Sequence, residues 1–132
     1  MRMLTKTLAA LLIVTAPAAA LAEVLKRLLE NAVKFTPVNG HIALDIVAES
    51  ADFVRLSVTD DGIGMDTETR ERIFLPFVQG DGSLSRSYAG VGLGLAYVAR
   101  MVEALGGTVD VESEPGQGSR FTIVLPTRPP AP

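Results

Sequence analysis

The chain of 132 residues contains no cysteine. A disulfide framework and a thiolate metal site are therefore both excluded. Histidine occurs once, as His41, so a cluster of histidine ligands is excluded and a Ser/His/Asp triad would depend on that residue. Basic residues are also scarce, because 12 Lys and Arg against 15 Asp and Glu give a net charge of -3. This balance argues against a nucleic-acid-binding protein, which needs a basic patch.

The length and the hydrophobic content of 48% fit a single folded domain rather than a disordered chain. Apolar residues are concentrated at the start, where residues 1–22 contain Arg2 and Lys6 and no acidic residue. A basic start, an apolar run over residues 8–14 and small residues before Glu23 are typical of a secretory signal peptide. The run is too short and too interrupted to predict a transmembrane helix.

Two kinds of hydrophobic periodicity divide the rest of the chain. Apolar residues at spacings of three and four predict helices, and apolar residues that alternate with polar ones predict strands. The predicted elements are a helix over 18–35, strands over 41–50 and 53–60, a short helix over 67–74 capped by Asp66 or Thr67, a loop over 78–92, a helix over 93–105, and strands over 108–114 and 119–126. Strands that come in pairs indicate an α/β (α+β) two-layer sandwich, with a mostly antiparallel mixed sheet and helices on one face.

Two glycine loops are the first candidates for a binding site. Residues 60–64 read DDGIG, and residues 90–94 read GVGLG and run directly into a helix. Glycine lets a backbone approach a ligand closely, and free amides at a helix N-terminus suit phosphate. Neither loop is a dinucleotide fingerprint or a Walker loop, because no parallel βαβ unit and no Gly-Lys-Ser or Gly-Lys-Thr accompanies them. Ordinary turns use glycine too, so each loop alone carries little weight.

Polar side chains at two element ends are the second candidates. Asn31 and Lys34 are three residues apart on the first helix and face the same side. An amide oxygen can ligate Mg²⁺ and a lysine can pair with phosphate oxygens. Asp60 ends a strand, where its carboxylate could accept a hydrogen bond from an adenine amine. Each also has a plain reading, as a solvated helix end or as a turn residue before glycine.

Taken together, the motifs resemble the catalytic and ATP-binding domain of sensor histidine kinases, in the GHKL (Bergerat-fold) superfamily. LLENAVKFTP resembles the asparagine box of that family, DDGIGMD its first glycine box and IFLPFVQGD its phenylalanine box. GVGLGLAYVARMVEALGG and VESEPGQGSRFTIVLP resemble its second glycine box and closing strands. The motifs follow the family's order and spacing over residues 16–126, with an apolar segment over 1–15 before them and a proline-rich tail over 127–132 after them.

The resemblance implies ATP and Mg²⁺ as ligands and gives individual residues a role. Asn31 is the implied Mg²⁺ ligand, Asp60 receives the adenine amine, and Phe74 and Phe77 anchor a nucleotide lid over residues 78–92, although both also suit a core. The residues implied to bind ATP are Asn31, Lys34, Asp60, Gly62, Gly64, Phe74, Phe77, Arg86, Gly90, Gly92, Gly94 and Leu95. Phosphoryl transfer needs a held triphosphate, a metal and positive charge rather than covalent work by the protein, so no catalytic residue is assigned.

Two positions depart from the family pattern. Arg27 stands one turn before Asn31, where many histidine kinases have a second asparagine and ATPase relatives such as gyrase B have a glutamate base. Arginine cannot activate water and Glu30 faces another side of the helix, so hydrolysis as the main activity is disfavoured. The alternatives for Arg27 are contact with phosphate or a weakening of metal binding. His41 starts a strand and lacks the acidic neighbour of the family's phosphoacceptor, so we expect the phosphoacceptor on a separate or missing dimerisation domain and little activity of the chain alone.

The resemblance also implies partners and a location. These are a histidine-bearing dimerisation domain, a response regulator downstream, a monomeric isolated domain, and contact with a membrane only through a sensor region outside this sequence. A non-catalytic nucleotide-binding module and an anti-sigma-type serine kinase stay open as alternatives, although KFTP after Asn31 and the sequence over 85–95 favour the histidine-kinase branch. On the family pattern residues 11–16 form a first strand and cleavage after Ala22 would cut a helix. We therefore expect a cytoplasmic domain, or an exported one if residues 1–22 are a signal peptide.

Overall fold

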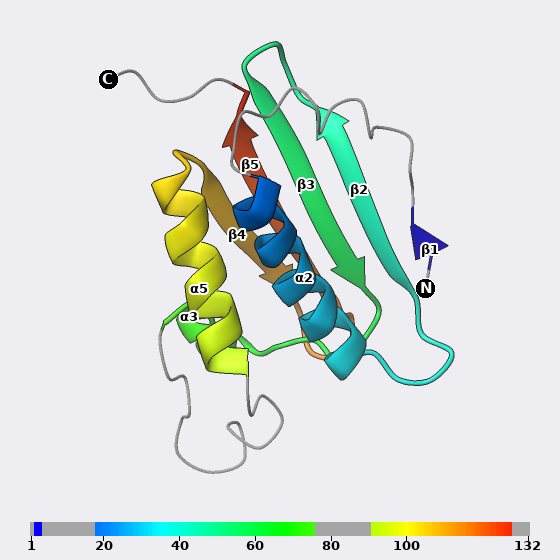
Figure 1. The fold of residues 1–132 in the computed structure, drawn as a ribbon. Coiled ribbons are helices and arrows are strands. Elements are labelled where there is room, and N and C mark those ends of the chain that lie inside the picture. The colour runs from blue at the N-terminus through cyan, green and yellow to red at the C-terminus, as the bar shows by residue number, and fades with distance from the viewer. Residues whose placement is uncertain (1, 4–17, 76–90, 128–132) are drawn as a thin grey trace.

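The centre of the fold is a five-stranded mixed sheet with the strand order β1-β2-β3-β5-β4 (Figure 1). A computed structural model describes residues 2–3, 18–75 and 91–127. The strands are β1 (Arg2–Met3), β2 (Ile42–Ala48), β3 (Phe53–Asp60), β4 (Thr108–Ser113) and β5 (Ser119–Pro126). Neighbouring strands from β2 to β4 are antiparallel, and β1 is parallel to β2. The mostly antiparallel mixed sheet predicted from the sequence is confirmed.

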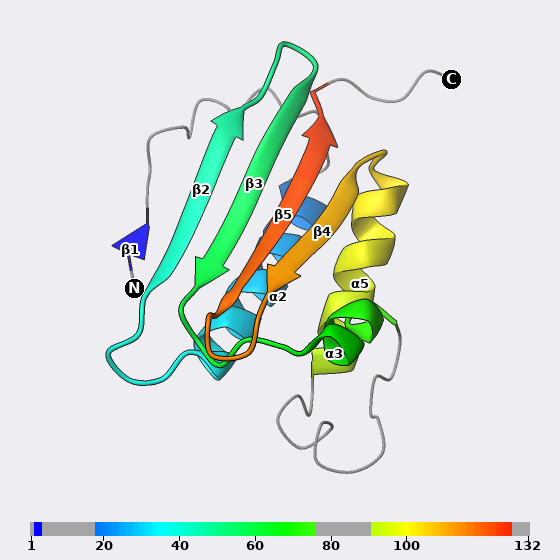
Figure 2. The same cartoon turned by 180° about the vertical axis from the view of Figure 1, so that it is seen from behind.

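The second layer of the fold is made of helices. The described residues form α2 (Ala18–Phe35), α3 (Thr67–Arg72) and α5 (Val91–Ala104). Helices α2 and α5 lie side by side on one face of the sheet, and in the view from behind none of the described helices covers the opposite face (Figures 1 and 2). The predicted two-layer sandwich is therefore confirmed. Within the described part of the chain, no helix combines the length and the apolar character that a membrane span requires.

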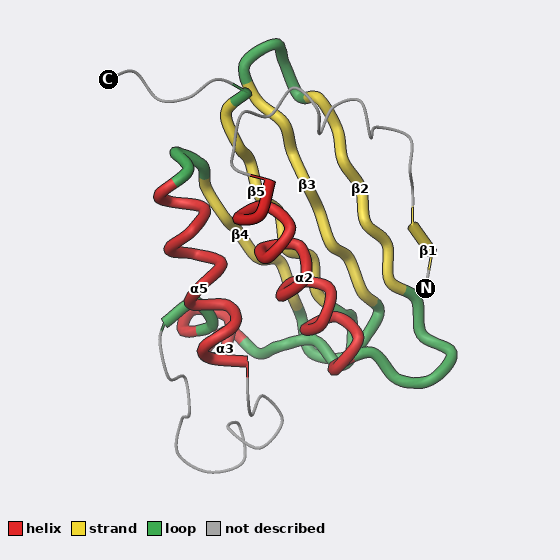
Figure 3. Tube along the Cα trace, in the orientation of Figure 1, coloured by secondary structure: helices red, strands yellow, loops and turns green. Residues whose placement is uncertain are grey.

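Figure 3 shows the helices and strands along the chain. Most of their boundaries agree closely with the periodicity of the sequence. Helix α2 and strands β3 and β5 have the predicted bounds. Helix α3 ends two residues earlier than predicted, and α5 begins two residues earlier and runs through Gly92 and Gly94. Asp66 is the cap of α3, because its carboxylate accepts a hydrogen bond of 2.7 Å from the amide of Thr69. The strand predicted over 11–16 lies outside the described residues.

The core lies between the two helices and the inner face of the sheet. Alternate residues of β3 and β5 point into it, and so does one stripe of α2 at spacings of four residues. The side chains that are no more than 1% exposed include Val24, Leu28 and Ala32 on α2, Val54, Leu56 and Val58 on β3, and Phe121, Ile123 and Leu125 on β5. Full burial of one such large side chain is worth about 1.5–3 kcal/mol, so this layer holds the sheet ends in place.

The turn between β4 and β5 folds back against the end of β3. Gly118 has a φ of +81°, and a Cβ atom on it would lie 2.0 Å from the carbonyl oxygen of Asp60. Gly116 has a φ of +76°, but a Cβ there would meet nothing within 4 Å. The amide of Gly116 donates a hydrogen bond of 2.7 Å to the carbonyl oxygen of Ile63. The turn is thus packed on the loop over residues 60–64.

We expect Gly118→Ala to lower the free energy of unfolding by about 2–5 kcal/mol. The left-handed backbone contributes about 1–2 kcal/mol of this loss, and the clash with Asp60 contributes about 1–3 kcal/mol. Gly116→Ala meets only the first cost and should lose about 1–2 kcal/mol. Urea unfolding followed by circular dichroism measures both variants. Equal losses in the two variants would contradict the close approach of Gly118 to β3.

Candidate functional site

A small pocket lies where the last turns of α2, the end of β3 and the start of β5 meet. The described residues that line it are Asn31, Phe35, Asp60, Ile63, Gly64, Met65, Ile73 and Ser119. The fold therefore brings together Asn31, Asp60 and Gly64, which come from two separate sequence motifs. The volume of the pocket is about 10 Å³, which is room for about one water molecule.

Asn31 brings an unpaired polar atom to this pocket. Its amide oxygen Oδ1 is buried and has no hydrogen-bond partner in the described structure. Leaving a buried acceptor unpaired costs about 1–3 kcal/mol, which makes such atoms rare in proteins unless a ligand satisfies them. Amide oxygens are ligands of hard cations such as Mg²⁺. The donor chemistry at this position therefore fits the metal that the sequence motif implies.

Asp60 brings a buried carboxylate to the same pocket. The residue is 6% exposed, and its Oδ1 accepts a hydrogen bond of 2.9 Å from the amide of Gly62. Burial raises the pKa of Asp60, and hydrogen bonds from the amides of Gly62 and Ser119 oppose that rise. An ionised carboxylate has about four acceptor positions, so these two amides leave room for a donor on a ligand.

The two glycines of the loop after β3 fit tightly against other segments. A Cβ on Gly62 would lie 2.2 Å from the carbonyl oxygen of Phe35, and one on Gly64 would lie 1.9 Å from that of Glu114. The Gly64 backbone lines the pocket, while Gly62 holds the Asp60 carboxylate through its amide. Both glycines thus shape the pocket through close backbone contacts.

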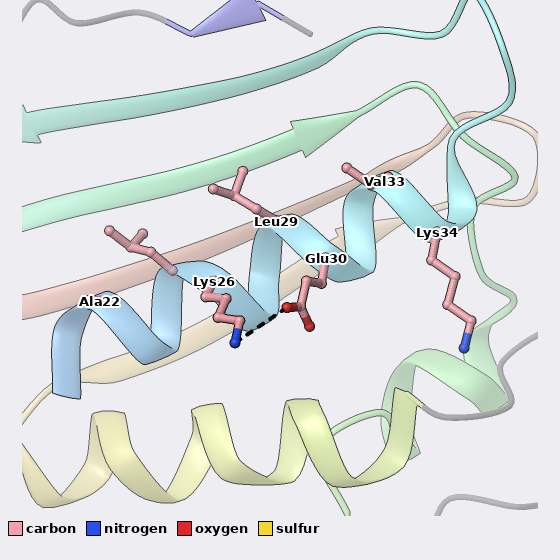
Figure 4. Close-up of a pocket in the computed structure, with 7 residues that line it drawn as sticks. Ala22, Lys26, Leu29, Glu30, Val33 and Lys34 are labelled. Carbon is pink, nitrogen blue, oxygen red and sulfur yellow. Dashed lines mark ion pairs between the residues drawn. The ribbon is translucent and has the colours of Figure 1, made fainter. Parts of the chain in front are cut away.

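Lys34 lies outside the pocket. Its side chain is exposed, with Nζ 5.7 Å from the centre of the Phe35 ring. It leaves α2 on the side opposite to Leu29 and Val33 (Figure 4). Together with Ala22, Leu25, Lys26, Leu29, Glu30 and Val33, it also lines a groove of about 670 Å³ along α2. The apolar character of most of this groove makes it unsuitable for phosphate groups.

The other predicted site residues lie in the core, on α5 or outside the described residues. The Phe74 ring packs edge-on against Phe121, with centroids 6.0 Å apart, and Leu95 is 1% exposed in the core. Gly92 and Gly94 lie in the first turns of α5, and a Cβ on Gly94 would meet nothing within 4 Å. The predicted site residues Phe77, Arg86 and Gly90 lie outside the described part of the chain.

Arg27, the departure from the family pattern, takes part in helix packing. Its Nε donates a hydrogen bond of 3.0 Å to Glu23 Oε1, and its guanidinium lies 4.3 Å from the centre of the Tyr97 ring on α5. A cation over an aromatic ring is a favourable contact. Arg27 thus joins α2 to α5 and is not among the residues that line the pocket.

His41 and Glu30 are also occupied elsewhere. His41 precedes β2 and is exposed, and its Nδ1 lies 2.9 Å from Asp61 Oδ2. Hydrogen bonds from His41 lower the pKa of Asp61. Glu30 is exposed and pairs with Lys26 at 3.9 Å (Figure 4). Neither side chain lines the pocket.

The sequence reasoning missed several residues of the pocket wall. Met65 and Ser119 form part of that wall, as do the apolar residues Ile63 and Ile73. The sequence does contain a signal for Ser119, because alternate residues of a strand share a face and Ser119 is therefore on the same face of β5 as the inward-facing Phe121 and Ile123. No local signal marks Ile63, whose place depends on how the loop after β3 folds.

Comparison with known proteins identifies the family. Residues 16–129 match the family described as histidine kinase-, DNA gyrase B- and HSP90-like ATPases. The sensor histidine kinase AruS of Pseudomonas aeruginosa is 53% identical over 104 residues, which cover 76% of this chain and 10% of that protein. The chain thus spans a small part of that curated relative.

Solved structures agree. The mycobacterial sensor histidine kinase MprB superposes with a TM-score of 0.75 at 30% identity, covering 89% of this chain and 78% of that one. Full-length ShkA, determined in complex with AMPPNP, has a TM-score of 0.69 at 41% identity, covering 86% of this chain and 22% of that one. From the matched residues and the shared fold, the chain belongs to the family of histidine kinase-, DNA gyrase B- and HSP90-like ATPases, as a domain of the histidine-kinase type.

Proposed function

We propose that this chain is the ATP-binding catalytic domain of a two-component sensor histidine kinase, with residues 16–126 as the functional unit. It binds Mg-ATP and delivers the phosphoryl group to a histidine on a separate dimerisation domain, from which a response regulator receives it. The domain acts as a monomer in the cytoplasm, where ATP is available. The observation that carries this proposal is the buried, unpaired Oδ1 of Asn31 in the same pocket as the buried carboxylate of Asp60.

Each described polar group of the pocket has a part in this proposal. Asp60 accepts a hydrogen bond from the amine of adenine while the amides of Gly62 and Ser119 hold its carboxylate. Asn31 ligates Mg²⁺, which neutralises phosphate charge when bound. Lys34, which lies outside the pocket, and the amides at the start of α5 would contact the phosphates, because cations and helix N-termini attract anions. The predicted contacts of Phe74, Phe77, Arg86, Gly90, Gly92, Gly94 and Leu95 belong to the same proposal.

Admission of the base requires a local rearrangement. The pocket has a volume of about 10 Å³, which is much less than a purine ring needs. Ile63 lines the pocket and is 47% exposed. Its side chain can therefore turn outward into solvent without leaving a cavity in the core. We expect the base to enter by displacing Ile63 while Asp60 and Gly64 stay in place.

The first test is nucleotide binding by calorimetry with wild type and Asp60→Asn. We expect wild type to bind ATP at sub-millimolar concentration, and Asp60→Asn to bind at least about tenfold more weakly, because an amide offers one acceptor oxygen where the carboxylate offers two. No binding by wild type at sub-millimolar ATP would refute the proposal.

The stability of Asp60→Asn provides its control. Burial raises the pKa of Asp60 in the folded state. The stabilising contribution of its protonated carboxyl group is therefore fully present below the pKa of the unfolded state, and it is lost as the pH rises through the pKa of the folded state. A neutral amide avoids this loss, so Asp60→Asn should melt no earlier than wild type at pH 7. Weak binding together with an unchanged melting temperature then reports on the ligand site itself.

The second test concerns the metal. Asn31→Leu removes the unpaired oxygen and should raise the unfolding free energy of the ligand-free domain by about 1 kcal/mol. It should also abolish the increase in ATP affinity that Mg²⁺ gives to wild type. Glu30→Gln, at an exposed neighbour on the same helix, should change neither quantity. If Asn31→Leu keeps the full increase in ATP affinity with Mg²⁺, Asn31 is not a ligand of the metal.

Transfer is tested with labelled ATP and a separately purified histidine-bearing dimerisation domain from a related sensor kinase. We expect acid-labile label on the added domain only when both proteins are present. The chain alone should stay unlabelled, because its one histidine is bound to Asp61 outside the pocket. Stable labelling of a serine would instead favour the serine-kinase alternative.

A further inference from the structure

Ser113, at the end of β4, occupies the centre of a buried polar cluster next to the pocket. The residue is 7% exposed. Its Oγ accepts a hydrogen bond of 2.8 Å from the amide of Met65 and donates one of 2.7 Å to the carbonyl oxygen of Gly118. It also lies 2.9 Å from Oγ of Ser119. The sequence reasoning assigned no role to this residue.

The proton count fixes the direction of these contacts. A serine hydroxyl has one proton and two acceptor positions. The proton of Ser113 goes to the carbonyl of Gly118, so Ser119 must donate in the contact between the two hydroxyls. The Ser113 hydroxyl then uses all of its hydrogen-bonding capacity. Its loss would leave both the Met65 amide and the Gly118 carbonyl without this partner inside the protein.

The groups held by Ser113 are walls of the proposed base pocket. Met65 and Ser119 both line that pocket together with Asp60. Ser119 is paired with Asp60 across β3 and β5, and with Ser113 across β4 and β5. The amide of Ser119 also donates to the Asp60 carboxylate. A shift of the Ser113 hydroxyl would therefore move both the wall at Met65 and the strand that supports Asp60.

Arg70 on α3 holds Ser113 from the other side. Its Nη1 donates a hydrogen bond of 2.8 Å to the carbonyl oxygen of Ser113 and lies 3.5 Å from Glu114 Oε1. A hydrogen bond from a charged donor is stronger than a neutral one. The same helix is fixed at its start by the Asp66 cap. Helix α3 is thus tied to the end of β4 and, through Ser113, to the pocket wall.

We propose that Ser113, held by Arg70, is a positioning residue that fixes Met65 and Ser119 around Asp60 and so gives the pocket its selectivity for adenine over other bases. This inference rests on the proposed function, since it assumes that the pocket receives the base of a nucleotide. Ser113 does not touch the base. It acts by fixing the distance between the Asp60 carboxylate and the opposite wall of the pocket.

The experiment measures the affinities of ATP and GTP by calorimetry for wild type and Ser113→Ala. We expect wild type to prefer ATP, and Ser113→Ala to lose about tenfold of that preference, because the Met65 amide, the Gly118 carbonyl and the Ser119 hydroxyl lose their common partner. Ser113→Thr keeps the hydroxyl and should recover the preference. Ser57→Ala is the matched control, a serine 3% exposed on β3 that does not line the pocket, and it should leave the ratio of the two affinities unchanged.

Variants at Arg70 and Arg72 provide a second test, which stays valid even if the Ser113→Ala variant does not fold. Arg70→Met should lower the preference for ATP about threefold, since one charged hydrogen bond to Ser113 is lost. Arg72→Met on the same helix, whose partner is Glu68 at 3.9 Å, should have no effect. Melting temperatures of all variants separate a loss of selectivity from a loss of fold.

The outcomes separate this inference from the proposed function. If wild type binds no ATP, the proposed function fails and this inference fails with it. Suppose that wild type binds ATP in preference to GTP. If Ser113→Ala or Arg70→Met then lowers the affinities for both nucleotides by the same factor, only this inference is overturned. The same holds if wild type binds both nucleotides equally. A selective loss in the Ser113 and Arg70 variants, absent from Ser57→Ala and Arg72→Met, supports it.

Discussion

The contact between the backbones of Gly118 and Asp60 is the constraint on which the rest of the site depends. A side chain at Gly118 would collide with the Asp60 carbonyl at 2.0 Å, so β5 can begin beside the end of β3 only because this residue is glycine. That approach sets Ser119 opposite Asp60 in the sheet and lets its amide reach the carboxylate. It also brings the Gly118 carbonyl within reach of the Ser113 hydroxyl. One backbone contact therefore sets the position of both the carboxylate and the wall that faces it.

The site retains polar groups that a protein selected only for stability would lack. The buried Oδ1 of Asn31 has no partner in the described structure, and the ionised form of Asp60 is disfavoured by its burial. Both features lower the stability of the ligand-free fold, and both are relieved by a ligand with a cation and a hydrogen-bond donor. Stability is instead supplied by the apolar layer between the helices and β3 and β5. The core thus compensates for a pocket whose polar groups are incompletely paired.

Sequence periodicity was sufficient for helix α2 and strands β3 and β5, because each has a buried stripe of its own, whereas strand β1 (Arg2–Met3) was not predicted. Helix α2 and strands β3 and β5 have the predicted bounds, and Asp60 and Asn31, which come from two motifs, line one pocket. Gly92 was assigned to the loop over 78–92, since glycine has low helix propensity, yet α5 includes it. Ser113 and Arg70 could not be found from local patterns. Their roles depend on contacts 48 and 43 residues apart along the chain, which no periodicity reports.

The position of Arg27 argues against hydrolysis as the main chemistry of the proposed function. Hydrolysis requires a base near the phosphates that activates water. At the position where ATPase relatives carry glutamate, this chain has an arginine that is held between Glu23 and Tyr97. Glu30 is exposed and paired with Lys26. Among the described residues that line the pocket, Asp60 is the one carboxylate, and two backbone amides already bind it. Under the proposed function, the described residues offer no carboxylate that is placed as a water-activating base, which favours transfer to an acceptor on another domain over hydrolysis.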